Sequence, residues 1–506
     1  MSTQHTVDAI VIGGGHNGLV CAASLAQDGR RTVLVEAADV LGGIAASRAL
    51  AEGYNVPGLL HDTARLRPKV VKALELEDRH GLVLRDRPDV AVLRAGQSPL
   101  MLGATDCEGA SEHDRRAYRD YRAVIHQFRT VFGRVVDTEP PDISGERITG
   151  LWDAMLTGWS LRRLGSAALY EFLRLPPMPV NDWMDELFDD PILQAALAFP
   201  IALGGFTGPR APGTVATLML EECTANQEVV GGPPALIRSL VSACEAHRVD
   251  VRTGSEVRRI RLETGCVRGV DLADGTTIDA PVVVATCDPR RTFLDLLHPA
   301  GVSPSLLHAA ENIRARGTVA KVHLAVEGSC PLTSEHGDPI ERFRLVSSLD
   351  DMERASDTVK YGEMFAEPPL EVQVTPSDDS GTRGYVVSVI AGYVAHDLNG
   401  GWTDAQRAAL GDHVVHRLAA HIPDFSKRII AREVLSPVDL AQQYRLSGGH
   451  LYHGEHALDQ ILFMRPMARC ANHKTPVEGL FLGGSGTHPG GGFTGGPGWL
   501  SARAVL

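Results

Sequence analysis

The chain has 506 residues, which is too long for one simple core, so we expect at least two domains. Its apolar content of 44% and charged content of 22% are ordinary for a globular protein, and the formal net charge of −13 argues against a nucleic-acid-binding protein. The 8 cysteines form no CxxC pair, which argues against a disulfide framework or a metal site and favours the reducing cytoplasm.

The N-terminus reaches its first apolar run without a basic region or a cleavage site, so the sequence indicates no secretory signal. Long apolar runs such as residues 195–206 are too short to cross a bilayer. We therefore expect a cytoplasmic protein. Contact between a surface patch and a membrane stays open at this point.

The first predicted unit is a strand, a glycine turn, a helix and a second strand. Residues 7–12 are a short apolar run typical of a buried parallel strand, and residues 17–28 have the apolar spacing of a helix. Between them, Gly13, Gly15 and Gly18 follow the GxGxxG pattern. Residues 32–36 form the second strand, which ends on Glu36. This context predicts a dinucleotide-binding unit.

Each of these residue types has a role in holding a dinucleotide. Gly13 permits the tight turn, Gly15 lets the backbone approach a pyrophosphate, and Gly18 lets the helix pack closely on the strand. The helix N-terminus offers free N–H groups to the phosphates. Glu36 accepts hydrogen bonds from a ribose hydroxyl. Both NAD and FAD satisfy this pattern.

Three later segments distinguish these two cofactors. Gly42 and Gly43 follow the acid closely, as in the flavoprotein extension of the pattern. Residues 231–289 predict a helix over 235–247, then consecutive strands with an Asp-Gly hairpin turn at 273–276. Residues 483–498, which we call the C-terminal glycine loop, contain nine glycines in sixteen positions between a strand at 480–482 and a helix from about Pro497.

Residues 448–466 and 484–498 carry the most specific signature. Together with the preceding segments they resemble the phytoene desaturase-like branch of the amine oxidase superfamily of FAD flavoproteins, over nearly the whole chain. The resemblance implies an α/β fold: a Rossmann-type, doubly wound FAD-binding domain with an interleaved α+β substrate domain. We expect residues 1–100, 226–300 and 470–506 in the first domain, and 101–225 and 301–469 in the second.

The resemblance also implies cofactor contacts. It places the backbone of Val257 against adenine, and Gly484 and Ser485 against the pyrophosphate side of FAD. It places Gly491, Gly492, Phe493 and Thr494 beside the flavin ring. The helix that follows then points its N-terminus at the flavin C2 carbonyl, where negative charge collects on reduction.

Candidate catalytic groups are few, because flavin dehydrogenation needs little beyond a hydride acceptor and a dry pocket. His453 and Glu455 act as base or substrate partner, or their segment only anchors the glycine loop. His488 touches the flavin or packs beneath the loop. Arg465 binds pyrophosphate or forms a structural salt bridge. His61 and Asp62 face the active site, or Asp62 caps a turn.

Two sequence patterns that the chain lacks limit the reaction that we expect. No cysteine pair follows Gly42 and Gly43, so the chain is not a disulfide reductase, and no second GxGxxG suggests an NADPH domain. We expect electrons to come from an apolar small-molecule substrate and to leave to oxygen or a quinone. The leading hypothesis is an FAD-dependent dehydrogenase or oxidase that desaturates a C–C or C–N bond by hydride transfer to flavin N5. A flavin-dependent isomerase, an amine oxidase and a non-catalytic flavoprotein are the alternatives.

Overall fold

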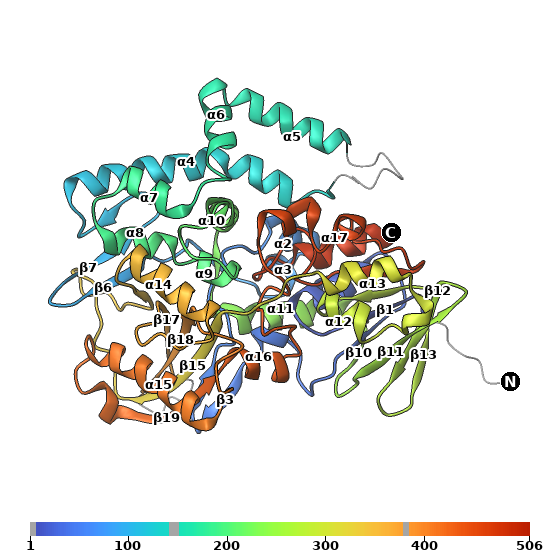
Figure 1. Ribbon diagram of the computed structural model, residues 1–506. Coiled ribbons are helices and arrows are strands. Elements are labelled where there is room, and N and C mark those ends of the chain that lie inside the picture. Colours follow the sequence, from blue (N-terminus) through green and yellow to red (C-terminus); the bar gives the residue numbers. More distant parts are fainter. Residues whose placement is uncertain (1–6, 141–150, 378–383) are drawn as a thin grey trace.

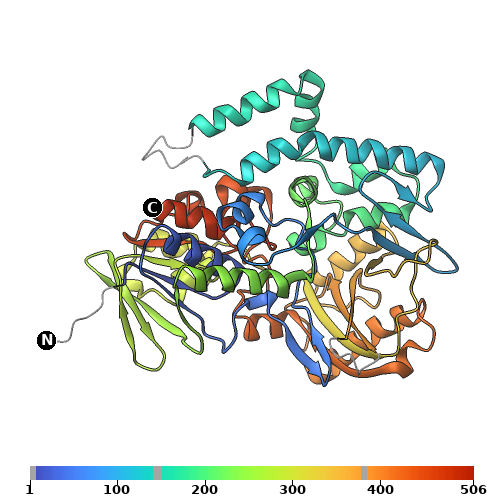
Figure 2. The ribbon, with the colours of Figure 1, turned by 180° about the vertical axis from the view of Figure 1, so that it is seen from behind.

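The computed structural model describes residues 7–140, 151–377 and 384–506. Figure 1 shows two sheets at opposite ends of the molecule, with a layer of helices above them. Seen from behind in Figure 2, the C-terminal helix Gly496–Val505 lies at the end that holds the strand Ala9–Ile12. In the part of the chain that the structure describes, no helix is long and apolar enough to cross a membrane.

The first sheet has five parallel strands in the order β10–β2–β1–β14–β20. The strands are β1 (Ala9–Ile12), β2 (Thr32–Val35), β10 (Asp250–Arg252), β14 (Val283–Ala285) and β20 (Leu480–Leu482). All residues of the three central strands are buried, which is why these strands are continuous apolar runs in the sequence. The strands come from the start, middle and end of the chain, as expected for a discontinuous domain.

Helices and a small sheet cover the two faces of the parallel sheet. Val11 and Leu34 pack toward α1 (His16–Gln27), α11 (Gly232–Ala246) and α17 (Gly496–Val505). Ile10 and Val33 pack on the other face. That face is covered by the antiparallel strands β11 (Val257–Glu263), β12 (Cys266–Leu272) and β13 (Thr277–Asp279), with α12 (Pro289–Leu294) and α13 (Pro304–Glu311). The predicted hairpin turn therefore joins β12 to β13.

The second sheet has eight strands in the order β19–β15–β18–β17–β16–β6–β7–β8. The long strand β15, which lies next to the edge strand β19, is buried along its whole length except at Glu327. The strands are β6 (Val90–Arg94), β7 (Gln97–Leu102), β8 (Cys107–Glu108), β15 (Val319–Glu327), β16 (Arg342–Leu345), β17 (Leu370–Pro376), β18 (Gly384–Gly392) and β19 (Ile429–Leu435). Two small sheets pair β3 (Arg48–Ala51) with β4 (Tyr54–Val56) and β5 (Leu84–Arg85) with β9 (Glu228–Val229).

The remaining helices of the described residues fall into two groups. The layer above the sheets in Figure 1 contains α4 (Glu112–Val136), α5 (Leu151–Arg163), α6 (Ser166–Arg174), α7 (Val180–Leu187), α8 (Pro191–Ala198), α9 (Ile201–Gly204) and α10 (Thr214–Thr224). The others are α2 (Pro68–Ala73), α3 (Leu76–Arg79), α14 (Leu349–Lys360), α15 (Asp404–Ala419) and α16 (Pro437–Gln443). Single 3₁₀ turns lie at Gly43–Ala45, Pro299–Gly301, Phe425–Arg428, Leu458–Gln460, Leu462–Met464 and Ala468–Cys470.

One segment lies in a different sheet from the one that we expected. Residues 90–100 were assigned to the cofactor domain, but β6 and β7 belong to the eight-stranded sheet, where Ala91 pairs in parallel with Phe343. The strand β6 is apolar and almost wholly buried, so its pattern carries no information about which sheet it joins. The rest of the domain division stays a prediction.

Helix α17 closes the first domain by lying directly against α1. A Cβ added at Gly498 would come within 2.0 Å of the Asn17 carbonyl oxygen, so only glycine fits there. Three residues later, Ser501 Oγ lies 3.6 Å from Cys21 Sγ on α1. The last helix of the chain is thereby held against the N-terminus of the first helix.

We predict that Gly498→Ala destabilises the fold by about 3 kcal/mol, at the upper end of overpacking effects, because the clash is with backbone. The matched control is Gly158→Ala on α5, where an added Cβ meets nothing within 4 Å. That change removes a helical glycine and stabilises by up to about 1 kcal/mol. Thermal and denaturant unfolding experiments measure the free energy of unfolding of both variants. Equal effects of the two substitutions would contradict the packing argument.

Candidate cofactor and active site

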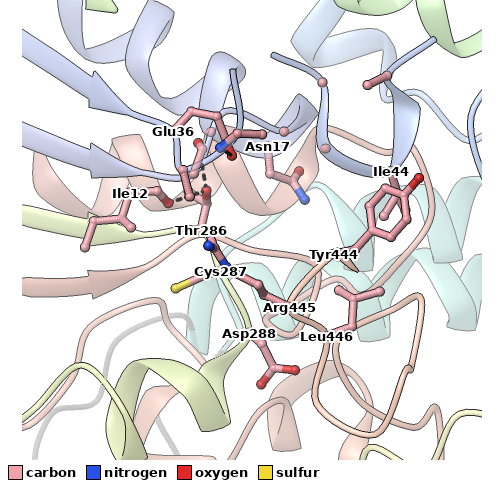
Figure 3. Close-up of a pocket in the computed structure, with 18 of the residues that line it drawn as sticks. Ile12, Asn17, Glu36, Ile44, Thr286, Cys287, Asp288, Tyr444, Arg445 and Leu446 are labelled. Atoms are coloured by element: carbon pink, nitrogen blue, oxygen red, sulfur yellow. Dashed lines mark hydrogen bonds between the residues drawn. The ribbon is translucent and has the colours of Figure 1, made fainter. Parts of the chain in front are cut away.

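A cavity of about 410 Å³, which we call the cofactor cavity, opens at the carboxyl ends of the parallel strands. Figure 3 shows Ile12 and Glu36 at one side of it, and Tyr444, Arg445 and Leu446 away from Glu36. The sequence-predicted residues that line it are Gly13, Gly15, Gly18, Glu36, Gly42, Gly43, Val257, His453 and Ser485. Segments far apart in the sequence thus meet around one space.

Gly18 and Gly15 differ in the space around them, and the open space lies beside Gly15, on the side of the cofactor cavity. A Cβ on Gly18 would lie 1.9 Å from the Gly13 carbonyl oxygen, so this glycine is required for packing. A Cβ on Gly15 would meet nothing within 4 Å, although its φ of −73° suits any residue. The fold therefore does not require glycine at position 15. Glycine there leaves the backbone uncovered where a ligand approaches.

The start of α1 presents backbone donors to the same space. Helix α1 begins after Gly15 with no side-chain cap and no acidic residue in its first turn. The Glu36 carboxylate closes the adjacent wall, where it accepts hydrogen bonds from the backbone N–H of Gly14 at 2.6 Å and of Ala38 at 2.8 Å. An uncapped helix N-terminus beside a fixed carboxylate suits a phosphate with a neighbouring ribose.

Three buried polar atoms of cavity-lining residues have no hydrogen-bond partner among the described residues. They are Nε2 of His16, Oδ1 of Asn17 and Nδ1 of His453. Burial lowers the pKa of His16 to about 3 and that of His453 to about 4, so both imidazoles are neutral at pH 7. Unsatisfied polar atoms at a cavity wall fit a polar ligand, because burying them without a partner costs free energy.

The opposite wall of the cofactor cavity is formed by residues that no sequence motif indicated. Glu256 accepts hydrogen bonds from Arg291 at 3.2 Å and from Arg445 at 2.9 Å. Asp288 caps α12 and accepts a hydrogen bond from the Ser447 backbone N–H at 3.0 Å, while burial raises its pKa. One local signal was present: Asp288 follows a buried strand almost directly, at the edge where ligands of parallel sheets bind.

Most of the C-terminal glycine loop does not line the cofactor cavity. Ser485 lies on the wall, where its Oγ accepts a hydrogen bond from Asn17 Nδ2 at 3.1 Å. Phe493 reaches the wall indirectly, since its ring meets His16 edge-on at 5.2 Å. Four of the predicted cofactor contacts do not line the cofactor cavity: Gly484, Gly491, Gly492 and Thr494. All four are buried, and Gly492 lines a separate space described below.

The three catalytic candidates do not come together. Only His453 lines the cofactor cavity. Both carboxylate oxygens of Glu455 bind Arg316, at 2.8 and 3.1 Å, which fits the anchoring alternative. His488 donates from Nε2 to the Val135 carbonyl oxygen at 3.1 Å, and burial lowers its pKa to about 4. It thus contacts the end of α4 and does not line the cofactor cavity.

Arg465 holds the glycine loop to the segment that contains His453. Its side chain is 1% exposed and donates six hydrogen bonds to five backbone carbonyl oxygens. These belong to Tyr452, Gly454, Glu455, Gln460 and Ser485. Arg465 therefore forms neither of the two contacts expected from the sequence: it binds backbone carbonyls in place of a carboxylate, and it does not line the cavity.

A second, smaller space of about 40 Å³ lies on the other side of the glycine loop. We call it the charged chamber, because most of its lining side chains are ionisable. They are His61, Asp62, Arg65, Arg87, Glu221, Glu222, Arg344, Glu371 and Tyr452, with Gly492 on the wall. Asp62 also caps a turn by accepting from the Ala64 N–H at 2.7 Å, as the capping alternative expected.

We predict that Arg465→Lys destabilises the protein by on the order of 3 kcal/mol. A lysine ammonium has three donors, so at least two of the five buried carbonyls lose their partner, at roughly 1–3 kcal/mol each. Arg469→Lys, at an exposed position on the same segment, is the control and is expected to be neutral. Denaturant unfolding compares them. A neutral Arg465→Lys would show that the carbonyls find other donors.

Comparison with known proteins agrees with this geometry. The model of the family described as flavin containing amine oxidoreductase matches residues 18–505. Pyridine nucleotide-disulfide oxidoreductase domain-containing protein 2 of Rattus norvegicus is 28% identical over 99% of this chain and 93% of its own length. Phytoene desaturase (neurosporene-forming) of Cereibacter sphaeroides is 24% identical over 98% of this chain and 93% of its own.

A solved structure of putrescine oxidase bound to putrescine shares the fold, with a TM-score of 0.62 and 14% identity over 99% of each chain. The predicted Rossmann-type architecture and the predicted cofactor, FAD, are confirmed. The phytoene desaturase-like resemblance is confirmed as well. The chain belongs to the family of flavin-containing amine oxidoreductases and is an FAD-dependent oxidoreductase.

Proposed function

We propose that the chain is a dehydrogenase or oxidase that desaturates a C–C or C–N bond of a largely apolar small molecule. The observation that carries the proposal is the cofactor cavity, with bare backbone at Gly15, an uncapped α1 and the Glu36 carboxylate around one space. The phytoene desaturase relative supports an apolar substrate. Bound FAD supplies the hydride acceptor at N5.

The residues present fit FAD in the following way. The N-terminus of α1 and the bare backbone at Gly15 meet the pyrophosphate, while Glu36 accepts hydrogen bonds from the adenosine ribose. The adenine lies against Val257, which is on the wall of the cavity. Further contacts with the cofactor are proposed for Gly13, Gly18, Gly42, Gly43, Gly484, Ser485, Gly491, Gly492, Phe493 and Thr494. The unpartnered atoms of His16 and Asn17 find their partners on the same cofactor.

The residues around FAD exclude water and orient the substrate. Of the catalytic candidates, we retain His453 as a hydrogen-bond partner at the cavity wall, since its neutral ring and unpartnered Nδ1 suit that role. We propose oxygen or a quinone as electron acceptor, because the sequence offers no second dinucleotide pattern.

We predict that Gly15→Val folds but loses FAD. The position has a φ of −73° and open space around an added Cβ, so the fold tolerates the side chain, while valine occupies the path of the pyrophosphate. The purified variant is expected to be colourless and to unfold like wild-type protein stripped of flavin. Visible absorbance and unfolding of the two apoproteins measure this. A yellow variant would still hold FAD, and this would contradict a pyrophosphate position beside Gly15.

The reaction itself is tested by anaerobic mixing of the holoenzyme with candidate substrates. We expect the substrate to bleach the flavin and to gain one double bond. Bleaching by an isoprenoid or acyl compound and by no amine would exclude the amine oxidase alternative. Bleaching by amines alone would contradict C–C desaturation and favour the amine oxidase alternative. Turnover under these conditions with no electron acceptor and no net oxidation would favour the isomerase.

A further inference from the structure

The charged chamber shares a wall with the segment proposed to lie beside the flavin. Gly492 and Tyr452 line the chamber, and Arg65 donates from Nη1 to the Gly491 carbonyl oxygen at 3.1 Å. Arg65 is 4% exposed and also binds Thr224 on α10, so it joins that helix to the glycine loop. If residues 491–494 run along the flavin, the chamber lies where a substrate meets it. This inference rests on the proposed function.

Most charges that line the chamber are paired with one another. Arg344 binds Glu371 through Nε at 3.0 Å and Nη2 at 2.8 Å. Arg87 binds Asp62 at 2.7 Å. Glu222 lies between two cations, with Arg122 at 2.9 Å and Arg87 at 3.6 Å. The Arg344–Glu371 pair is buried and the others are partly buried, and together they form the frame of the chamber.

Glu221, next to Glu222 on α10, pairs with one arginine, whereas Glu222 pairs with two. The Oε1 atom of Glu221 accepts from Arg65 Nη1 at 2.6 Å, whereas its Oε2 has no hydrogen bond from the described residues. The Nδ1 atom of His456 lies 3.9 Å from Oε1 and is itself unpartnered. Because His456 Nε2 accepts the Gly491 N–H at 3.2 Å, the ring proton belongs on Nδ1, toward Glu221. One carboxylate oxygen is thus held and the other is left for a ligand.

The two neighbouring carboxyl groups also differ in protonation. Burial raises the pKa of Glu221 to about 7 in spite of Arg65, whereas the surrounding arginines lower the pKa of Glu222. When the environment gives two neighbouring acids different pKa values, one of them can exchange protons near pH 7 while the other stays ionised. The ionisable groups that face Glu221 are Arg65, Asp62, Glu222, Tyr452 and His456, with Arg87, Arg344 and Glu371 across the chamber.

We propose that Glu221 is the catalytic residue that exchanges a proton with the substrate, and that Arg65 is the positioning residue that fixes it against the glycine loop. In the oxidation, one C–H bond of the substrate breaks with its electron pair, which leaves as hydride to bound FAD. The proton on the neighbouring carbon or nitrogen passes to the Glu221 carboxylate. The electrons of that second bond form the new double bond, and FAD takes up two electrons.

The test needs no substrate. The reduction potential of bound FAD is measured against pH, from 5 to 9, by equilibration with reference dyes. If Glu221 exchanges protons beside the flavin, its ionisation differs between oxidised and reduced enzyme, and it adds its own break to the slope of potential against pH, distinct from the break that reduced flavin produces by itself. Glu221→Gln is expected to remove this added break. Glu222→Gln, the matched neighbour, is expected to keep it.

Arg65→Gln provides a second variant if Glu221→Gln folds poorly. Removal of the cation that lowers the Glu221 pKa is expected to move the added break to higher pH. With a substrate in hand, Glu221→Gln is expected to slow flavin reduction by about 10²–10⁴-fold. A wild-type enzyme without the added break, an added break that survives in Glu221→Gln, or one lost equally in Glu222→Gln would overturn the inference. A chain that holds no FAD would instead overturn the proposed function.

Discussion

The start of α1 depends on backbone contacts that are too close for any side chain. Gly18 lies against the carbonyl of Gly13, and Gly498 lies against the carbonyl of Asn17. These contacts hold the first and last helices together and leave the N–H groups of α1 directed at the cofactor cavity. Because a helix N-terminus binds an anion through backbone dipoles, the position of the backbone determines the site more than any single side chain does.

A second constraint is that the site's loops are held by buried polar groups. Arg465 carries a buried cation with carbonyl oxygens as its hydrogen-bond partners, and burial lowers its pKa to about 9, so it stays mostly protonated at pH 7. Its bonds tie Tyr452 and Gly454, on either side of His453, to Ser485. The wall of the cavity and the glycine loop therefore form one connected unit.

The glycine loop separates two chemically different spaces. The wall of the cofactor cavity combines backbone and neutral imidazoles with charged groups such as Glu36, Glu256 and Arg445, which suits a polar ligand. The wall of the charged chamber is formed mainly by paired ions, with Glu221 bound to Arg65. Within the loop, a Cβ on Gly491 would lie 2.1 Å from the Tyr452 ring, so this glycine is required for packing.

The sequence by itself determined the local units of this protein: β1, α1 and β2 with Glu36, the β12–β13 hairpin, β20 and the start of α17. Glycine spacing and apolar periodicity are local properties, and these elements depend on them. Only the tertiary structure decided that β6 joins the eight-stranded sheet, that Arg465 binds carbonyls, that Glu455 is anchored by Arg316, and that Arg65 and Glu221 meet the glycine loop. Arg65 and Gly491 are 426 positions apart, and no local pattern encodes such a contact, because it arises from how separately stable elements pack.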